Sequence, residues 1–284
     1  MVFMEIKMSN PLVAAYRKPA LYISLPSKGK FYQQKPKLSV DDELAVYAMT
    51  ARDELVSKTP DALFNGEATI SLIKSCCPDI IDPNEVPVND LLTILIAIRQ
   101  ASYGQEIDLD VKCPQCEFMN QLQIDGSRLL AGTMKDAPEN VKLDSGFKVF
   151  CKPYSLRDRT LLQVQTIKQQ KLIESLADAQ LSDEEREAQF GKTFVEIADL
   201  TVGLIANCIT KVQTPDNEIF EADKIDLILE WLQSITKADY DLIKATVENL
   251  SENNVDTNFT ATCQGCSHEW QTTVDLDIAN FFEG

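Results

Sequence analysis

The chain has 284 residues, of which 44% are hydrophobic, and its formal net charge at pH 7 is −17. Its 44 acidic and 27 basic side chains argue against a protein that binds nucleic acid, because such binding rests on clustered Lys and Arg that neutralise phosphates. The sequence contains no run of about 18 apolar residues and no secretory signal at its N-terminus, so we expect no membrane partner and a location in the cytoplasm.

The first 20 residues show no regular period and contain two prolines, so we expect an extended N-terminal arm over residues 1–20. The only basic stretch of the chain lies in and just after this arm and consists of Lys7, Arg17, Lys18, Lys28, Lys30, Lys35 and Lys37. With so acidic a chain, this stretch fits a solvated arm, or one that docks onto an acidic neighbour, better than a nucleic-acid contact.

The first half mixes strand and helix patterns. Residues 21–25 are typical of a strand, and residues 26–29 carry turn chemistry. A Ser-x-x-Asp pattern at residues 39–42 predicts a helix start, because the hydroxyl and the carboxylate satisfy free amides there. We expect helical segments to continue through residues 44–73, and an apolar helix over residues 88–101.

The second half carries more helix. Ser155 and Asp158 repeat the Ser-x-x-acidic pattern and predict a helix start. A 3.6-residue period over residues 161–181, and a new helix from Ser182 to Cys208, predict a helical hairpin that projects from the fold. Further helices are expected over residues 222–234 and 234–250, and strands over residues 258–262 and 270–276. The fold class is therefore α+β, with helical bodies joined to small antiparallel sheets.

The two halves present similar segments in the same order, which indicates an internal duplication. Ile70–Cys76 matches Val202–Cys208, and the apolar helix at 88–101 matches the one at 222–234. Each copy then closes on a Cys-x-x-Cys turn. We expect two duplicated halves related by a pseudo-twofold axis, a first repeat over residues 21–135 and a second over residues 141–284 that contains the inserted helical hairpin.

The two Cys-x-x-Cys turns run from Cys113 to Cys116 and from Cys263 to Cys266, and each is flanked by alternating segments typical of a β-hairpin. A tetrahedral zinc site needs four soft ligands, which two such turns supply together. We predict one structural zinc ion held by all four cysteines in a zinc-ribbon-like pair of knuckles. Two alternatives are a redox or iron site of the rubredoxin type, and a site in which His268 replaces a cysteine if the knuckles do not meet.

The other four cysteines, Cys76, Cys77, Cys151 and Cys208, lie in apolar patterns and are expected to be small buried core residues.

Nothing in the sequence points to catalysis. The chain has one histidine and lacks a Gly-rich phosphate loop, a Gly-x-Ser-x-Gly motif and a His-Glu-x-x-His motif. Asp79, Asp82 and Glu85 form an acidic loop without the glycine and final glutamate of a calcium-binding loop, so we expect it to be solvated. We therefore expect a protein that is not an enzyme, with no catalytic residues and no small-molecule substrate.

Several segments, taken in order, carry a family resemblance. They are Leu25-Pro-Ser-Lys-Gly-Lys30, Ile73-Lys-Ser-Cys76, the helix over residues 88–99, and residues 101–107 leading into the first Cys-x-x-Cys turn. Together they resemble the baseplate hub protein family of T4-type contractile-tailed phages, over residues 21–130 and again, more faintly, from 141 to the C-terminus.

The resemblance implies a structural component of the phage tail baseplate, in the hub or at the junction of wedge and hub. Such a component binds other baseplate and tail proteins, and it resides in the virion after assembly in the host cytoplasm. Two alternatives are a hub assembly chaperone that is absent from the mature virion, and a cellular zinc-ribbon adaptor.

Overall fold

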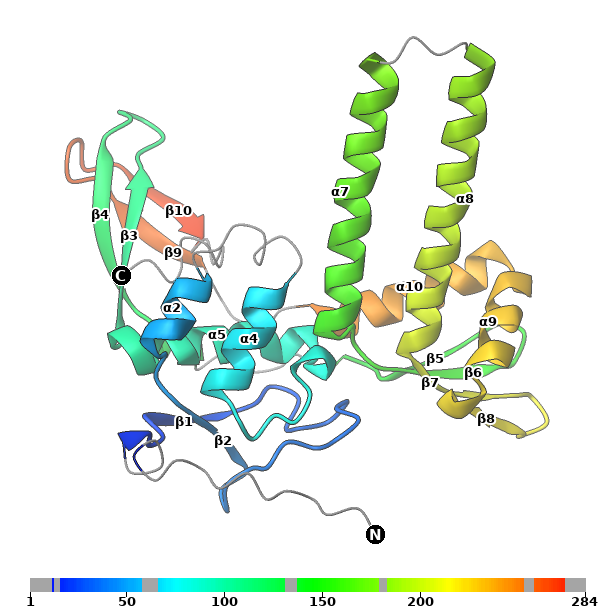
Figure 1. Ribbon diagram of the computed structural model, residues 1–284, viewed down its shortest axis with the longest axis horizontal. Coiled ribbons are helices and arrows are strands. Elements are labelled where there is room, and N and C mark those ends of the chain that lie inside the picture. The colour runs from blue at the N-terminus through cyan, green and yellow to red at the C-terminus, as the bar shows by residue number, and fades with distance from the viewer. Residues whose placement is uncertain are drawn as a thin grey trace.

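The computed structural model describes Leu12 and residues 16–57, 66–130, 137–178, 183–252 and 258–273. The fold is α+β, as predicted, with helices and small antiparallel sheets (Figure 1). Most of the expected N-terminal arm lies outside the described residues. Its last residues lie against the first half, where the Arg17 guanidinium donates to the Ser75 carbonyl at 2.7 Å and the Ala20 amide donates to the Val46 carbonyl at 2.8 Å.

The first half is built around the long apolar helix α5. Its elements are β1 (Leu21–Ser24), β2 (Glu43–Val46), α2 (Ala51–Ser57), α4 (Glu67–Cys76), η1 (Pro83–Glu85), α5 (Val88–Tyr103), β3 (Glu106–Lys112), β4 (Met119–Asp125) and α6 (Ser127–Leu130). Strands β1 and β2 pair as an antiparallel ribbon, and their buried side chains pack with those of α4 and α5 in one hydrophobic core.

The prediction that a helix starts at Ser39 is wrong. The Ser39 hydroxyl accepts hydrogen bonds from the amides of Asp41 and Glu43 at 3.3 and 3.2 Å, and Asp42 takes a positive φ of 59°. The chain therefore turns and enters strand β2 instead of a helix. Pairing with β1 buries Leu44 and Val46 as strand residues, and long-range pairing of this kind overrides a local capping pattern.

The helix start of the first half lies eleven residues later and is matched in the second half. The Thr50 amide and hydroxyl both donate to the Asp53 carboxylate, at 2.8 and 2.7 Å, before α2. The Ser155 amide and hydroxyl donate to the Asp158 carboxylate at 2.9 and 2.7 Å before α7, the helix start that was predicted there. Both pairs are capping boxes that satisfy free amides at a helix N-terminus.

The second half places a four-stranded sheet beside a set of helices. Its elements are β5 (Asn140–Lys142), β6 (Lys148–Cys151), α7 (Leu156–Asp178), α8 (Asp183–Cys208), β7 (Ile209–Gln213), β8 (Ile219–Glu221), η2 (Ala222–Lys224), α9 (Ile225–Ser234), α10 (Lys237–Ser251), β9 (Asn258–Thr262) and β10 (Glu269–Thr273). The sheet order is β5-β6-β7-β8, and α7 and α8 stand out from the body as a helical hairpin (Figure 1).

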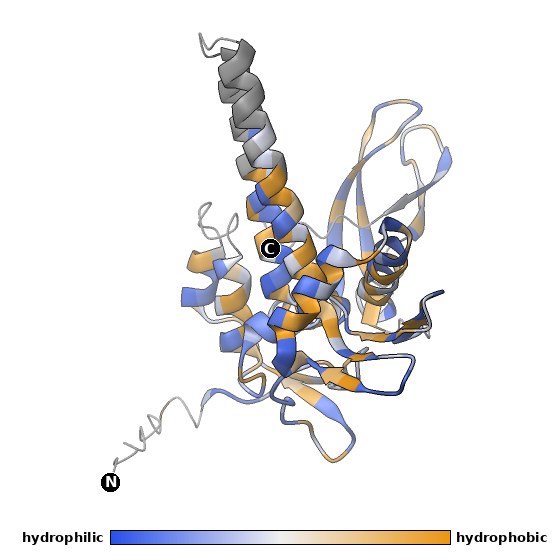
Figure 2. Cartoon of the chain, turned by 90° about the vertical axis from the view of Figure 1, so that its right-hand side faces the viewer, coloured by the Kyte–Doolittle hydropathy of each residue, from blue (hydrophilic) through white to orange (hydrophobic). Residues whose placement is uncertain are grey.

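A second hydrophobic core lies between this sheet and the helices α8, α9 and α10. Figure 2 shows both hydrophobic and hydrophilic residues on the helices of the body, which is the pattern of helices that bury one side only. The two cores are separate clusters, so each half has its own packed interior.

The C-terminal ends of helices α5 and α10 each accept a similar hydrogen bond from the segment that precedes a helix start. The Met49 amide donates to the Ser102 hydroxyl at the end of α5 at 2.9 Å, and the Tyr154 amide donates to the Ser251 hydroxyl at the end of α10 at 2.9 Å. The sequence matched the helix at 88–101 with the one at 222–234, which is α9. These hydrogen bonds favour a match of α5 with α10, which also precedes the second hairpin.

The two halves are also joined directly, by a short antiparallel contact between the segments that precede α5 and α7. The Val88 amide donates to the Tyr154 carbonyl at 2.9 Å, and the Leu156 amide donates to the Val86 carbonyl at 2.8 Å. Leu156 is buried in the core of the first half. The joint between the halves therefore does not depend on the cysteines alone.

The acidic loop expected to be solvated supports this joint. The Arg157 guanidinium lies 3.6 Å from the Asp82 carboxylate and 3.4 Å from the Glu85 carboxylate. Glu85 is buried although the loop is acidic, and Arg157 supplies its counter-charge.

The Leu-Pro-Ser-Lys-Gly segment has a structural role that its sequence did not reveal. Its turn docks on the first turn of α5, where the buried Asp90 carboxylate accepts hydrogen bonds from the Ser27 amide at 2.7 Å, from the Ser27 hydroxyl, and from the Tyr32 hydroxyl at 2.9 Å. Burial raises the pKa of Asp90 to about 6, although these donors oppose the shift.

Candidate metal centre

The two Cys-x-x-Cys turns form the tips of two hairpins, β3–β4 and β9–β10, and both tips have the same backbone geometry. In the first, the Cys113 amide donates to the Phe118 carbonyl at 2.9 Å, and Glu117 takes a φ of 59°. In the second, the Cys263 amide donates to the His268 carbonyl at 2.9 Å, and Ser267 takes a φ of 58°. Each turn therefore holds its two cysteines on the same side of the hairpin tip.

The structure brings the four predicted cysteines together from positions about 150 residues apart in the chain. Their sulfur atoms all lie within 4.8 Å of one another. The sulfurs of Cys113 and Cys266 are 3.8 Å apart, and those of Cys116 and Cys263 are 3.5 Å apart. Four sulfurs bound at about 2.3 Å to one tetrahedral zinc ion would stand about 3.8 Å apart, whereas disulfide sulfurs stand about 2.05 Å apart. The spacing is that of a metal cage and not of a disulfide pair.

Backbone amides point at the first sulfur of each turn. The Gln115 amide donates to the Cys113 sulfur at 3.4 Å, and the Gly265 amide donates to the Cys263 sulfur at 3.3 Å. Burial raises the pKa of Cys263, but hydrogen bonds from the amides of Cys266 and Gly265 outweigh it and lower this pKa to about 6. Such amides favour the thiolate, which is the form that binds metal.

The pKa of Cys116, the second cysteine of the first turn, shifts in the opposite direction. The Phe118 amide lowers the pKa of Cys116, but the neighbouring thiols, Cys266 first among them, raise it to about 12. Sulfur atoms this close cannot all be ionised unless a cation lies among them, because like charges disfavour one another. Binding of a cation would therefore release protons from the cluster.

Asn120 joins the two knuckles and was not foreseen from the sequence. It lies on β4 and is fully buried, and its side-chain oxygen accepts a hydrogen bond from the Gln264 amide of the other knuckle at 2.8 Å. Its amide group donates to the carbonyls of Val111 and Phe118 in its own hairpin, at 3.3 and 3.1 Å. Asn120 thus holds the Gln264 amide in place beside the cluster.

We expect Asn120→Ala to destabilise the paired knuckles by about 1–3 kcal/mol, because it leaves the Gln264 amide without its buried acceptor. Hydrogen exchange at Gln264 should accelerate, measured by mass spectrometry of peptides that contain Gln264 after exchange in the full-length chain. Gln123→Ala is the matched control, since Gln123 lies on the same strand and makes one exposed hydrogen bond, to Asp108. Unchanged exchange at Gln264 in Asn120→Ala would contradict this role.

The aromatic residue just past the first turn, Phe118, lies partly at the surface. Its side chain is 46% exposed and covers Gly265, where an added Cβ would approach the ring to 3.2 Å. Trp270 is half-buried, and its ring stacks on His268 with centroids 6.1 Å apart. The knuckles meet, so the condition under which His268 would complete the site does not arise.

The remaining cysteines are buried in the two hydrophobic cores, as predicted, and burial raises the pKa of Cys76 and of Cys151 to about 12 in each case. These thiols are protonated core residues. A cage of four thiolates, by contrast, suits a soft tetrahedral cation such as zinc or iron.

Comparison with known proteins indicates the kind of protein in which this cysteine cluster lies. A family model described as T4 bacteriophage base plate protein matches residues 19–283, nearly the whole chain. The searches of curated proteins and of solved structures gave no match. Within the described part of the chain, no helix combines the length and the apolar character needed to cross a membrane.

Proposed function

Because the chain belongs to the T4 bacteriophage base plate protein family, we propose that it is a structural protein of the hub, or of the junction between wedge and hub, in a contractile phage tail. The family match over residues 19–283 is the observation that carries this proposal. It supports other baseplate proteins as partners, a place in the virion tail and a structural role. Assembly in the host cytoplasm and the lack of catalysis are further parts of the proposal.

We propose that Cys113, Cys116, Cys263 and Cys266 bind one zinc ion as a structural staple. The sulfur spacing of 3.5 and 3.8 Å and the amides that donate to the first sulfur of each turn support it. Four protein thiolates complete the tetrahedral shell and leave no open position, so zinc held in this way has no Lewis-acid role. It would tie the C-terminal hairpin β9–β10 to the hairpin β3–β4 of the first half.

We further propose that the chain arose by duplication, with a first repeat over residues 21–135 and a second over residues 141–284. Matched hydrogen bonds support this history. The Tyr47 amide donates to the Cys76 carbonyl and the Lys152 amide donates to the Cys208 carbonyl, both at 2.8 Å, in addition to the two capping boxes and the two matched helix ends. Equivalent knuckles then follow equivalent helices, α5 and α10.

Quantitative mass spectrometry of purified virions tests the structural role. We expect the chain at a fixed ratio to other baseplate proteins in intact particles, and the same ratio in isolated tails. A chain that is abundant in the infected cell and absent from purified particles would instead be the assembly chaperone, and the proposal would fail. A chain that captures only host proteins would favour the cellular adaptor.

A further inference from the structure

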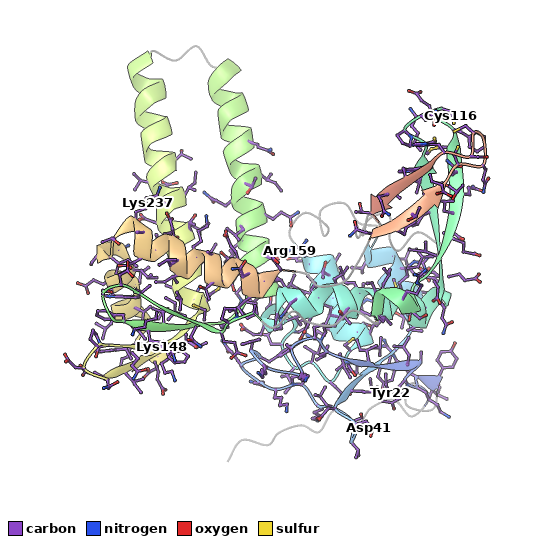
Figure 3. All side chains as sticks on the ribbon, turned by 180° about the vertical axis from the view of Figure 1, so that it is seen from behind. Tyr22, Asp41, Cys116, Lys148, Arg159 and Lys237 are labelled. Atoms are coloured by element: carbon purple, nitrogen blue, oxygen red, sulfur yellow. The ribbon has the colours of Figure 1, made fainter. Side chains whose placement is uncertain are left out.

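The two hairpins that carry the cysteines meet at their tips, and a groove lies between them below the tips. Near the tips, the Gln264 amide donates to the Asn120 side chain at 2.8 Å, and the Gln264 side chain donates to the Gln121 carbonyl at 3.4 Å. Figure 3 shows the hairpins side by side, with Cys116 at their tip. Toward the body of the molecule, residues 122–129 and 258–262 line a cavity of about 790 Å³, which we call the hairpin groove.

The hairpin groove contains apolar side chains that the two hydrophobic cores leave uncovered. Leu122 on β4 and Phe259 on β9 line it and are half-buried, and among the described residues neither core includes them. Ile124 and Ala261 line it as well. Within the described part of the chain each hairpin is a separate sheet of two strands. Because a two-stranded hairpin is at best marginally stable until its apolar face packs against further structure, the groove has room and need for one more segment of chain.

The sequence that follows β10 supplies such a segment. β10 ends at Thr273, which pairs with Asn258, and Asn258 lines the hairpin groove. Residues 274–284 lie outside the described part of the chain, and the strand predicted over residues 270–276 extends into them. Their sequence is Val-Asp-Leu-Asp-Ile-Ala-Asn-Phe-Phe-Glu-Gly, with large apolar residues at the alternate positions 274, 276 and 278 and again at 281 and 282.

This alternation continues that of β10. Trp270 and Thr272 are half-buried and pair with Ala261 and Phe259, both of which line the groove. Residues that lie directly opposite in an antiparallel pair point to the same face, so the period of two assigns the apolar positions after Thr272 to the face of the groove. An extended chain rises about 3.3 Å per residue, so residues 274–278 span about 17 Å, more than the stretch of β4 that lines the groove.

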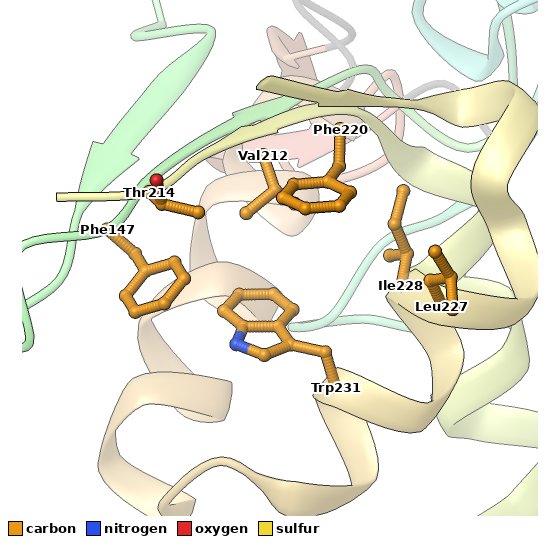
Figure 4. Close-up of a pocket in the computed structure, with 7 residues that line it drawn as sticks. All are labelled: Phe147, Val212, Thr214, Phe220, Leu227, Ile228 and Trp231. Carbon is orange, nitrogen blue, oxygen red and sulfur yellow. The ribbon is translucent and has the colours of Figure 1, made fainter. Parts of the chain in front are cut away.

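Another apolar cavity of the molecule does not suit this segment. The pocket under α9 measures about 220 Å³, and its lining includes the aromatic rings of Phe147, Phe220 and Trp231 (Figure 4). In Figure 1, α9 lies at the right of the long axis and the hairpins at the left. The hairpin groove is larger, with a volume of about 790 Å³, and it lies where β10 ends.

We propose that residues 274–284 fill the hairpin groove, with Val274, Leu276 and Ile278 packed against Leu122 and Phe259. The segment removes the apolar surface of both hairpins from water, and this burial adds a second link between them besides the cysteines. The inference goes beyond the baseplate role. It uses none of the four cysteines, so its failure would leave the zinc proposal and the baseplate proposal as they stand.

Photo-crosslinking in the full-length chain tests the proposal. With benzoylphenylalanine in place of Phe281, we expect irradiation to link this position to residues 122–129 or 258–262 of the same chain, identified by mass spectrometry of a product with the mass of one chain. Benzoylphenylalanine in place of Val40 is the control, since Val40 is fully exposed and does not line the groove. A link from position 281 to another region, a link to a second chain, or no link would overturn the proposal.

A substitution within the segment gives a second test. Leu276→Asp with Ile278→Asp should lower the yield of the crosslink from position 281 about tenfold or more, because carboxylates resist burial against apolar side chains. Hydrogen exchange of peptides that cover residues 122–129 and 258–262 should accelerate as well. Val40→Asp with Leu242→Asp is the matched control, since both side chains are exposed and lie outside the groove, and it should change neither result. A crosslink that survives Leu276→Asp with Ile278→Asp would contradict the proposal.

Discussion

The purified chain is expected to contain one equivalent of zinc, and Cys113→Ser combined with Cys263→Ser should lose it. Each substitution removes one sulfur from a different knuckle, and two remaining thiolates cannot complete a tetrahedral site. Structural zinc sites contribute about 10–16 kcal/mol of apparent binding free energy, comparable with the stability of a whole domain, so this is the largest effect that we predict. Inductively coupled plasma analysis of the wild type and the double variant measures it.

Cys151→Ala is the control for this experiment, because it removes a core thiol outside the cluster and should keep the zinc. Two equivalents of metal in the wild type, or none, would refute the shared site. A coloured protein with visible absorbance and bound iron would refute zinc and favour the rubredoxin-type alternative.

Metal removal should weaken only one of the two links between the halves. On chelation, amides of the hairpins β3–β4 and β9–β10 are expected to exchange faster, while the Val88 and Leu156 amides stay protected by the direct contact between the halves. Hydrogen exchange with and without chelator distinguishes the two regions. Loss of protection at Val88 and Leu156 would show that the metal alone holds the halves together.

The second large effect is expected at Asp90. Asp90→Ala should destabilise the chain by about 3 kcal/mol, because it leaves the buried donors of Ser27 and Tyr32 without an acceptor. Chemical denaturation measures the loss. Asp110→Ala, on the exposed side of β3, is the control and should change stability little. An Asp90→Ala chain as stable as the wild type would show that the Leu-Pro-Ser-Lys-Gly turn docks without this carboxylate.

The pH dependence of Asp90 has a definite sign. Its folded pKa of about 6 lies above the ordinary value for an unfolded chain, about 3.9, so between these values the folded state binds more protons. The part of the stability that comes from protonation of Asp90 is therefore full below about pH 4 and is lost as the pH rises through about 6, a change of about 3 kcal/mol. Asp90→Asn cannot titrate, so the stability of the wild type relative to this variant should fall by that amount from pH 4 to pH 7. A constant difference would contradict the buried carboxylate.

Much of the local structure could be predicted from the sequence. The strand at 21–25, the helix from Val88, the capping box at Ser155 and the strands on either side of both Cys-x-x-Cys turns all appear. Each of these signals acts within a few residues, through side-chain period, turn residues or caps. The failure at Ser39 is instructive, because the same pattern that starts a helix at Ser155 starts a turn at Ser39, where a partner strand was available.

The sequence by itself predicted which four cysteines cluster, because two thiols at that spacing can converge in a tight turn and two such turns supply four. Only the tertiary structure decided that the turns meet and that Asn120 links them. Each of those features depends on contacts between residues far apart in the chain. Such contacts form only when the packed cores of both halves and the segment between them bring the hairpins together. The spacing of residues along the chain does not predict that placement.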